Sequence, residues 1–118
     1  MVELYSEPAR IPVPGNKVIN EYIGAVSTGE SRLSVARMMA PAGWSEPFQT
    51  PEFDEFTIVL SGAITVDYGD GKSITAHVGE SVKVVAGERI RYSTGEDGAE
   101  YIAVCLPAFT PETVHRDE

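Results

Sequence analysis

Cysteine, histidine and basic residues are scarce in this sequence. Its 118 residues include one cysteine, two histidines, and nine lysines and arginines against eighteen aspartates and glutamates, for a formal net charge of −9. The single Cys105 excludes an internal disulfide and a thiolate zinc cluster. With only His77 and His115, the chain has no local paired-histidine metal motif. The acidic balance disfavours nucleic acids and anionic membrane surfaces as partners, because both need a cationic footprint.

Long hydrophobic runs are also missing. The longest apolar stretches have the length of a strand, so no membrane span is expected. Residues 1–5 carry neither a basic lead nor an apolar signal core, which favours a cytoplasmic location. Cys105 lies in an apolar stretch, which is typical of a small core residue rather than a nucleophile.

The apolar residues that are present alternate with period two, which predicts strands rather than helices. Turn residues separate the expected strands, at residues 18–24, 32–40, 55–60, 63–68, 73–78, 81–85, 89–93 and 101–106. About eight short strands in one chain of this length predict a single all-β domain, built as a sandwich, jelly roll or closed barrel.

The two ends of the chain differ from this pattern. Residues 1–15 contain three prolines and predict an extended arm along a sheet edge or a second subunit. Residues 107–118 form a tail that could hold one helical turn after residues 110–112. The expected organisation is therefore one domain over residues 1–118, with an N-terminal arm and a C-terminal tail.

Glycine spacing in the middle of the chain carries the strongest motif. Gly43, Glu55 and Gly62 have the spacing of the first motif of the cupin superfamily, G-x5-H-x-H-x3-E-x6-G, and Gly79 and Gly87 have that of the second, G-x5-P-x-G-x2-H-x3-N. Three histidine positions of the two motifs are occupied by other residues, namely Gln49, Pro51 and Ile90. Val85 and Thr94 stand at the proline and asparagine positions.

The chain thus resembles a small single-domain cupin that lacks the metal-binding histidines. The resemblance covers roughly residues 32–107 and implies a double-stranded β-helix, the cupin jelly-roll barrel, usually a homodimer, with ligands bound inside the barrel. Residues 53–62 and 106–109 are also similar to the ethanolamine-utilisation cupin, which lacks the same histidines. We expect no histidine-bound metal and no cofactor.

Strand alternation then predicts which side chains face the barrel interior. If Glu55 points inward as in the family, Thr57, Val59 and Ser61 also point inward. The neighbours in sequence would then form an outer apolar row, Phe56, Ile58 and Leu60. On the strand of the second motif, the same rule places Ile90 and Tyr92 inward and Arg89 and Arg91 outward.

Glu55 is the strongest candidate for chemistry. A carboxylate inside a barrel must be paired or protonated, because an isolated buried charge is costly. A raised pKa would suit it to general acid or base catalysis. The alternative is a leftover acid that pairs with a neighbouring arginine or tyrosine.

Other residues are candidates for holding a ligand. Gln49 can donate and accept hydrogen bonds, and Tyr92 could position a substrate or transfer a proton. Arg37 could hold an anion or pair with Glu55. The remaining candidates for ligand binding are Trp44, Glu46 and Ile90. The oxygen-rich cluster of Trp44, Glu46, Gln49, Glu52, Asp54 and Glu55 could instead bind calcium or magnesium, although a metal-free pocket is favoured.

Two functions from different classes follow. The first is a small-molecule-binding or sensing module that has lost the family's metal and kept the pocket. The second is a metal-independent isomerase, epimerase or lyase acting on a small polar or sugar-like molecule, with Glu55 as the proton-transferring group. An enzyme would need a second titratable group within hydrogen-bond reach of Glu55, whereas a binding protein needs only a pocket.

Overall fold

The computed structural model describes residues 1–117, which form eight strands and no helix. The strands are β1 (Ala9–Ile11), β2 (Val18–Ile23), β3 (Ser34–Ala40), β4 (Asp54–Tyr68), β5 (Lys72–His77), β6 (Ser81–Val84), β7 (Ile90–Ser93) and β8 (Ala99–Leu106). The predicted all-β class is confirmed, and the strands that were expected separately at residues 55–60 and 63–68 are one long strand. No helix in the described chain is long and apolar enough to cross a membrane.

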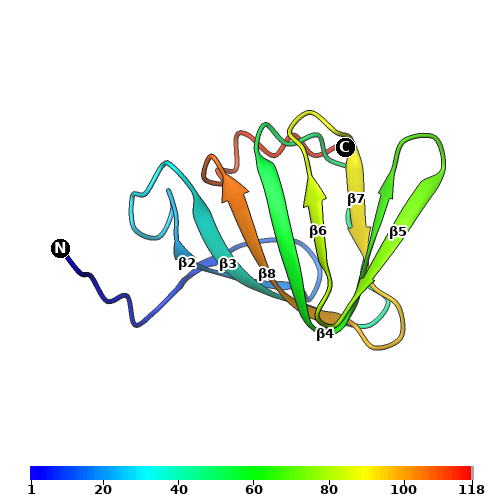
Figure 1. Cartoon of the computed structure of the whole chain (residues 1–118), viewed down its shortest axis with the longest axis horizontal. Helices are drawn as coiled ribbons and strands as arrows, with labels where there is room; N and C mark the ends of the chain where they lie inside the picture. The colour runs from blue at the N-terminus through cyan, green and yellow to red at the C-terminus, as the bar shows by residue number, and fades with distance from the viewer. Residues whose placement is uncertain (118) are drawn as a thin grey trace.

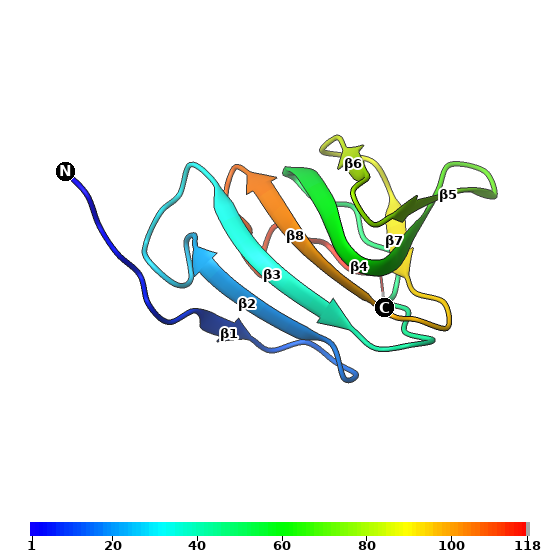
Figure 2. The same ribbon diagram turned by 60° about the horizontal axis from the view of Figure 1, so that its bottom comes forward.

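All strand pairs are antiparallel, and β4 connects the two halves of the structure (Figure 1). Its first half pairs with β8 and β6, and its second half pairs with β5 and β7. The sheet continues from β8 through β3 and β2 to β1 at its edge, as Figure 2 shows. The strands curve around a common interior and form the jelly-roll barrel that the sequence predicted.

β4 can change sheets because it bends at Gly62. The register between β4 and β8 shifts between Val59 and Ser61, next to the bend. Gly62 has φ +70°, and a Cβ atom there would lie 2.1 Å from the carbonyl oxygen of Gly98. Only glycine combines this backbone conformation with so close an approach. The last glycine of the first motif therefore has a structural reason for its position.

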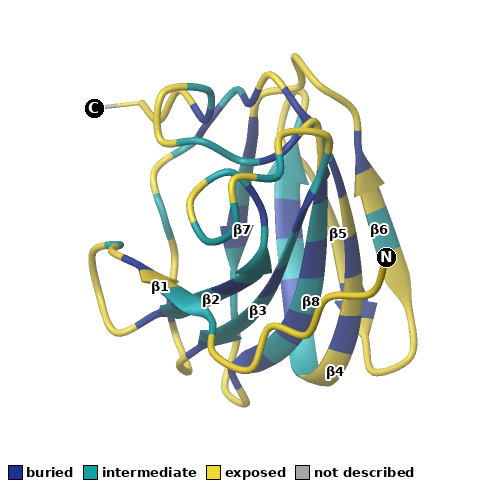
Figure 3. Cartoon of the chain, turned by 90° about the vertical axis from the view of Figure 1, so that its left-hand side faces the viewer, coloured by how far each residue is buried: buried dark blue, intermediate teal, exposed yellow. Residues whose placement is uncertain are grey.

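Burial along β4 follows the predicted alternation up to this bend. Glu55, Thr57 and Val59 are buried. The outer row is substantially exposed, with Phe56 at 39%, Ile58 at 46% and Leu60 at 45%. The prediction that Ser61 points inward is wrong: Ser61 is exposed, because the register shift after Val59 breaks the period of two. Figure 3 shows the same alternation as bands along β4 and β8.

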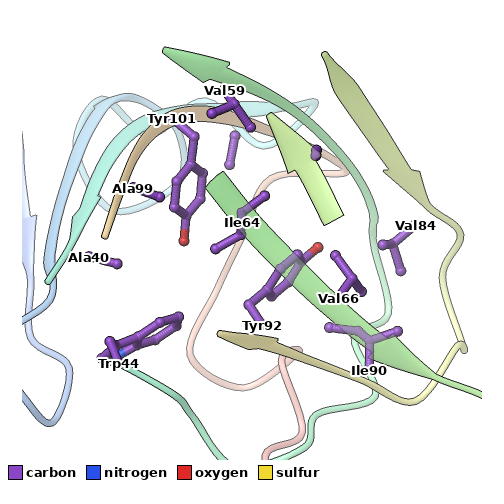
Figure 4. Packing of buried hydrophobic residues seen from close by; sticks show 12 residues of the cluster. Ala40, Trp44, Val59, Ile64, Val66, Val84, Ile90, Tyr92, Ala99 and Tyr101 are labelled. Atoms are coloured by element: carbon purple, nitrogen blue, oxygen red, sulfur yellow. The ribbon is translucent and has the colours of Figure 1, made fainter. Parts of the chain in front are cut away.

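The main apolar core lies between the two halves of the barrel (Figure 4). Ile64 and Val66 from β4 pack there with Ile90 and Tyr92 from β7, so the inward prediction for β7 is confirmed. Burying an aliphatic side chain of this size contributes about 1.5–3 kcal/mol relative to leaving it exposed. Packing of β4 on β7 therefore holds the two sheets together.

Both ends of the chain lie against the barrel. In the N-terminal arm, β1 pairs with the edge strand β2, while residues 1–6 before it are exposed. In the C-terminal tail, the backbone N–H groups of Thr50 and Glu52 donate to the carbonyl oxygens of His115 and Thr113. Residues 110–113 form a hydrogen-bonded turn rather than the expected helical turn. The tail thus covers the loop over residues 44–53.

We predict that Gly62→Ala destabilises the protein far more than Gly71→Ala. Both glycines have φ +70°, but nothing lies within 4 Å of a Cβ at Gly71. The left-handed conformation alone costs an alanine about 1–2 kcal/mol. The clash with the Gly98 carbonyl should add about 1–3 kcal/mol at Gly62. Urea unfolding followed by circular dichroism measures both variants, and equal losses of stability would contradict the role given to this close approach.

Candidate functional site

A cavity lies inside the barrel, between β2, β3, β4, β7 and β8, under the loop over residues 44–53 and the tail. The cavity has a volume of about 520 Å³, including the part open to solvent, and only a small part of it is wide enough to hold water. It is therefore a narrow pocket with room for a few waters or a slender molecule. The lining includes polar side chains, namely Lys17, Glu21, Ser34, Glu46, Gln49, Glu55, Tyr92 and Arg116. It also includes apolar side chains, among them Ile11, Ile19, Phe53, Phe109 and Val114.

The structure brings four of the sequence-predicted site residues to this cavity. Glu55 and Tyr92 reach it from β4 and β7 through strand alternation. Gln49 is held against β7, because its backbone exchanges two hydrogen bonds of 2.8 Å with Ile90. Glu46 precedes it in the same loop, where its Oε2 accepts a long hydrogen bond of 3.4 Å from the backbone N–H of Tyr92.

Three other predicted residues do not line the cavity. Ile90 is buried in the apolar core. Trp44 is also buried in the core, beside the polar end of the cavity, and points toward Tyr101 (Figure 4). Arg37 lies on the outer face of β3, where its guanidinium pairs with Glu100 at 2.6 Å. Pairing of Arg37 with Glu55, which the sequence allowed, does not occur.

Lys17 also lines the cavity, and the sequence did not predict it as a site residue. Its side chain is only 7% exposed, and its ammonium lies 4.3 Å from the ring centre of Trp44 and 5.3 Å from that of Tyr101. No hydrogen bond or ion pair joins it to another described residue. Burial lowers the pKa of Lys17, while the nearby carboxylates of Glu46 and Glu55 act in the opposite direction. The ammonium is thus held by aromatic faces and left available to a ligand.

The alternation of residues 17–22 favours burial of the row that contains Val18 and Tyr22, rather than the row that contains Lys17. Lys17, Ile19 and Glu21 are buried, whereas Val18 and Tyr22 are half-exposed. Two charged residues in one row ordinarily mark the solvent face of a strand. The only available signal was the pairing of one basic and one acidic position in that row.

Glu21 has a structural reason for its burial. Its Oε2 accepts hydrogen bonds from the backbone N–H groups of Val26 at 3.1 Å and Ser27 at 2.8 Å. A Cβ at Gly24 would lie 2.5 Å from the Glu21 carboxyl carbon, so the loop closes tightly over this side chain. The Oε2 atom of Glu21 therefore holds the loop after β2 in place.

Among the cavity residues, Glu55 is an acid whose pKa lies close to neutral pH. Burial raises its pKa to about 7, with a contribution from Glu46 in the same direction. The Lys17 ammonium opposes this rise, as does the nearby Tyr92 hydroxyl, although that hydroxyl makes no hydrogen bond of ordinary geometry. Burial also raises the pKa of Glu46. The negative charge of an ionised Glu46 therefore disfavours ionisation of Glu55.

Several buried hydroxyl groups around the barrel interior have no hydrogen-bond partner. They belong to Thr57 on β4, Tyr92 on β7 and Tyr101 on β8. An unsatisfied buried polar group costs about 1–3 kcal/mol unless water or a ligand pairs with it. Among the described residues, these three hydroxyl groups are therefore sites where a water or ligand would lower the cost of burial.

The residues at the family's metal positions do not fit a transition metal. Of Gln49, Pro51, Glu55 and Ile90, only Glu55 is a usual ligand. Among residues 1–117, no group of three or more histidine, cysteine, aspartate or glutamate side chains is placed to hold a metal ion.

The acidic side chains that could have bound calcium or magnesium do not converge on one site. The Asp54 Oδ1 accepts a hydrogen bond of 2.8 Å from the Ala86 backbone, and Glu52 pairs with His115. Both side chains therefore face other parts of the structure than Glu55. His77 pairs with Glu80 on the exposed surface and plays no part in the cavity.

Comparison with solved structures places the fold. No protein-family model matches the chain. The polyketide cyclase RemF from Streptomyces resistomycificus superposes with a TM-score of 0.78 at 18% sequence identity, covering 100% of this chain and 86% of that one. The putative ethanolamine utilization protein EutQ from Salmonella typhimurium LT2 superposes with a TM-score of 0.65 at 20% identity, covering 81% of this chain and 73% of that one. These similarities show a shared fold.

A longer protein contains a segment similar to most of this chain. Endoribonuclease YbeY from Myxococcus xanthus (strain DK1622) is 44% identical over 108 residues, which are 91% of this chain and 36% of that protein. The chain therefore spans about a third of the length of this relative. The endoribonuclease activity in its name is that of the whole protein.

We predict that Glu55→Gln makes the protein more stable at alkaline pH. The folded-state pKa of about 7 lies above the ordinary value of 4.5, so the folded state binds the proton more tightly. Wild-type stability therefore falls as pH rises from about 4.5 to about 7, by up to about 3 kcal/mol from this group. The glutamine variant lacks this loss, and the two proteins should converge in acid.

Unfolding by urea at a series of pH values measures this difference. Glu88→Gln, on an exposed turn, is the matched control and should follow the wild type. A stability difference between Glu55→Gln and wild type that stays constant from about pH 5 to about pH 8 would show that Glu55 is not titrating in this range.

Proposed function

The chain is a cupin by fold, and we propose that it binds a small polar molecule in the cavity of its barrel without a histidine-bound metal. The observation that carries this proposal is the set of cavity side chains that lack partners. Lys17 and Glu55 line the same narrow pocket, both are nearly fully buried, and neither makes an ion pair or hydrogen bond within the described chain. Leaving such groups unpaired is costly, and a ligand would remove that cost.

The shape of the cavity supports a small ligand with one apolar side. The lining combines polar groups with apolar side chains that include Ile11, Ile19 and Phe53. Ligand sites commonly combine an apolar lining with a few placed polar groups that fix orientation. The narrowness of the space favours a slender molecule over a sugar ring or a nucleotide.

The Myxococcus xanthus relative supports a binding module over a nuclease. A segment similar to this chain makes up only part of a longer protein, as expected of an accessory binding domain. A net charge of −9 opposes binding of RNA, whose phosphates require a basic surface. Both histidines are exposed and lie outside the cavity, as His77 pairs with Glu80 and His115 with Glu52. We therefore do not assign ribonuclease activity to this chain.

The second candidate is a metal-independent isomerase, epimerase or lyase, favoured by the pKa of Glu55 near neutrality. In such a reaction the Glu55 carboxylate would take a proton from a carbon next to a carbonyl group, and the electrons of that bond would form an enolate. Lys17 and Tyr92 would stabilise the enolate oxygen, and the proton would return to a carbon atom. Neither group is within hydrogen-bond geometry of Glu55 without a ligand, so binding remains the first proposal.

We also propose a cytoplasmic homodimer. The outer row of Phe56, Ile58 and Leu60 continues onto β8 at Leu106, and all four side chains are exposed. Exposed apolar patches of this kind are typical of interfaces. Sedimentation equilibrium should give twice the chain mass for the wild type and the single chain mass for Ile58→Glu, whereas a monomeric wild type would contradict the proposal.

A ligand-observed NMR screen of small polar compounds tests the binding proposal. We expect hits for the wild type that disappear in Ala36→Leu, because Ala36 lines the cavity and a leucine there would fill it. Thr75→Val on the exposed strand β5 is the control and should keep every hit. The proposal fails if no compound binds, or if the hits bind the filled variant equally well.

The same hits separate a binding protein from an enzyme. If Glu55 transfers protons, a bound compound with an acidic C–H should exchange that hydrogen for deuterium in D₂O with the wild type and not with Glu55→Gln. A compound that binds both proteins and exchanges in neither would support the binding module and contradict the enzyme.

A further inference from the structure

Four charged side chains line the cavity without pairing with one another. Lys17 and Arg116 are basic, and Glu46 and Glu55 are acidic. They lie close enough for Arg116 and Lys17 to affect the pKa of Glu46. Yet none of the four takes part in an ion pair within 4 Å among the described residues.

Elsewhere in the chain, opposite charges do form ion pairs. Arg91 contacts Asp67 at 2.9 Å, and Arg89 contacts Asp117 at 2.5 Å. These pairs are partly exposed, where an ion pair contributes little to stability. In the cavity, where Lys17 and Glu55 are buried and pairing would matter most, none of the described residues forms an ion pair with either of them.

The four charges sum to zero when both carboxyl groups are ionised, and a cationic group of a ligand beside Glu55 would favour its ionised form over the protonated one. The fifth charged residue of the lining, Glu21, is left out of this sum, because its Oε2 already accepts hydrogen bonds from two backbone N–H groups of the loop after β2. A ligand with a single charge would pair with either the two basic or the two acidic side chains and leave the other two unpaired. A ligand that carries both signs would pair with both sets.

We propose that the cavity binds a small zwitterion of the amino-acid type. The ligand carboxylate would lie toward Lys17 and Arg116, and its ammonium toward Glu46 and Glu55. A short aliphatic side chain would contact the apolar part of the lining. This inference rests on the proposed function and names the ligand class for the same cavity.

The chain contains its own reporter for this ligand. Trp44 is the only tryptophan, and the Lys17 ammonium lies 4.3 Å from the centre of its ring. An anion drawn to that ammonium would change the field on the indole. Binding should therefore alter the fluorescence of Trp44 and can be followed without a label.

Titration with matched probes tests the inference. L-alanine carries both charges, whereas propionate lacks the ammonium, ethylamine lacks the carboxylate, and 1-propanol carries neither. We expect L-alanine to bind at least about tenfold more tightly than each of the other three, as a charge-assisted hydrogen bond at each end provides. Equal affinities, or no binding of L-alanine, would overturn the proposal.

Two variants assign the two ends of the ligand. Lys17→Met should reduce L-alanine affinity to that of ethylamine, and Glu46→Gln should reduce it to that of propionate. Lys83→Met and Glu88→Gln, both on the exposed surface, are matched controls and should leave the affinity unchanged. If Lys17→Met does not fold by circular dichroism, the isosteric Glu46→Gln carries the test alone.

The outcome is separable from that of the proposed function. If 1-propanol or a singly charged probe binds the wild type at least as well as L-alanine and fails to bind Ala36→Leu, the cavity is a ligand site but not a zwitterion site. If none of the probes binds, the zwitterion inference is overturned, while the wider compound screen still decides whether the cavity binds a ligand.

Discussion

The contact between Gly62 and the Gly98 carbonyl is the constraint on which the barrel depends. It lets a single strand leave one sheet and enter the other. The first half of β4 brings Glu55 to the interior, and its second half pairs with β7, which brings Tyr92. The bend in β4 therefore sets how far apart Glu55 and Tyr92 lie in the cavity. A barrel built from two separate strands would need another device to hold that distance.

Much of the fold could be predicted because it depends on glycine positions and alternation. The spacing of Gly43, Glu55 and Gly62 resembles a cupin motif, and that resemblance implied the barrel and an inward Glu55. Strand alternation then placed Tyr92 inside the barrel. Parity failed at Ser61, because a register shift cannot be read from a period of two. Pattern alone cannot locate such irregularities.

The charged part of the site was harder to predict for a different reason. Lys17 lies in a row that resembles a solvent face, and its cavity is formed by segments far apart in sequence. Arg37 was expected near the ligand, but it lies on the outside and pairs with Glu100. Lys17 is buried and Arg37 is not, and this difference depends on how the strands pack in three dimensions. Buried charged side chains without partners lower the stability of the fold, and such side chains are common at functional sites.

The C-terminal tail covers one side of the cavity and belongs to no strand of the sheet. Backbone hydrogen bonds hold it to the loop over residues 44–53, and Arg116 lines the cavity from this segment. Detaching the tail would open the interior while every strand ladder stays intact, so exchange of a ligand need not wait for global unfolding. Residence time in the pocket would then be governed by the tail rather than by contacts with the ligand, and hydrogen exchange at the Thr50 and Glu52 amides would report it.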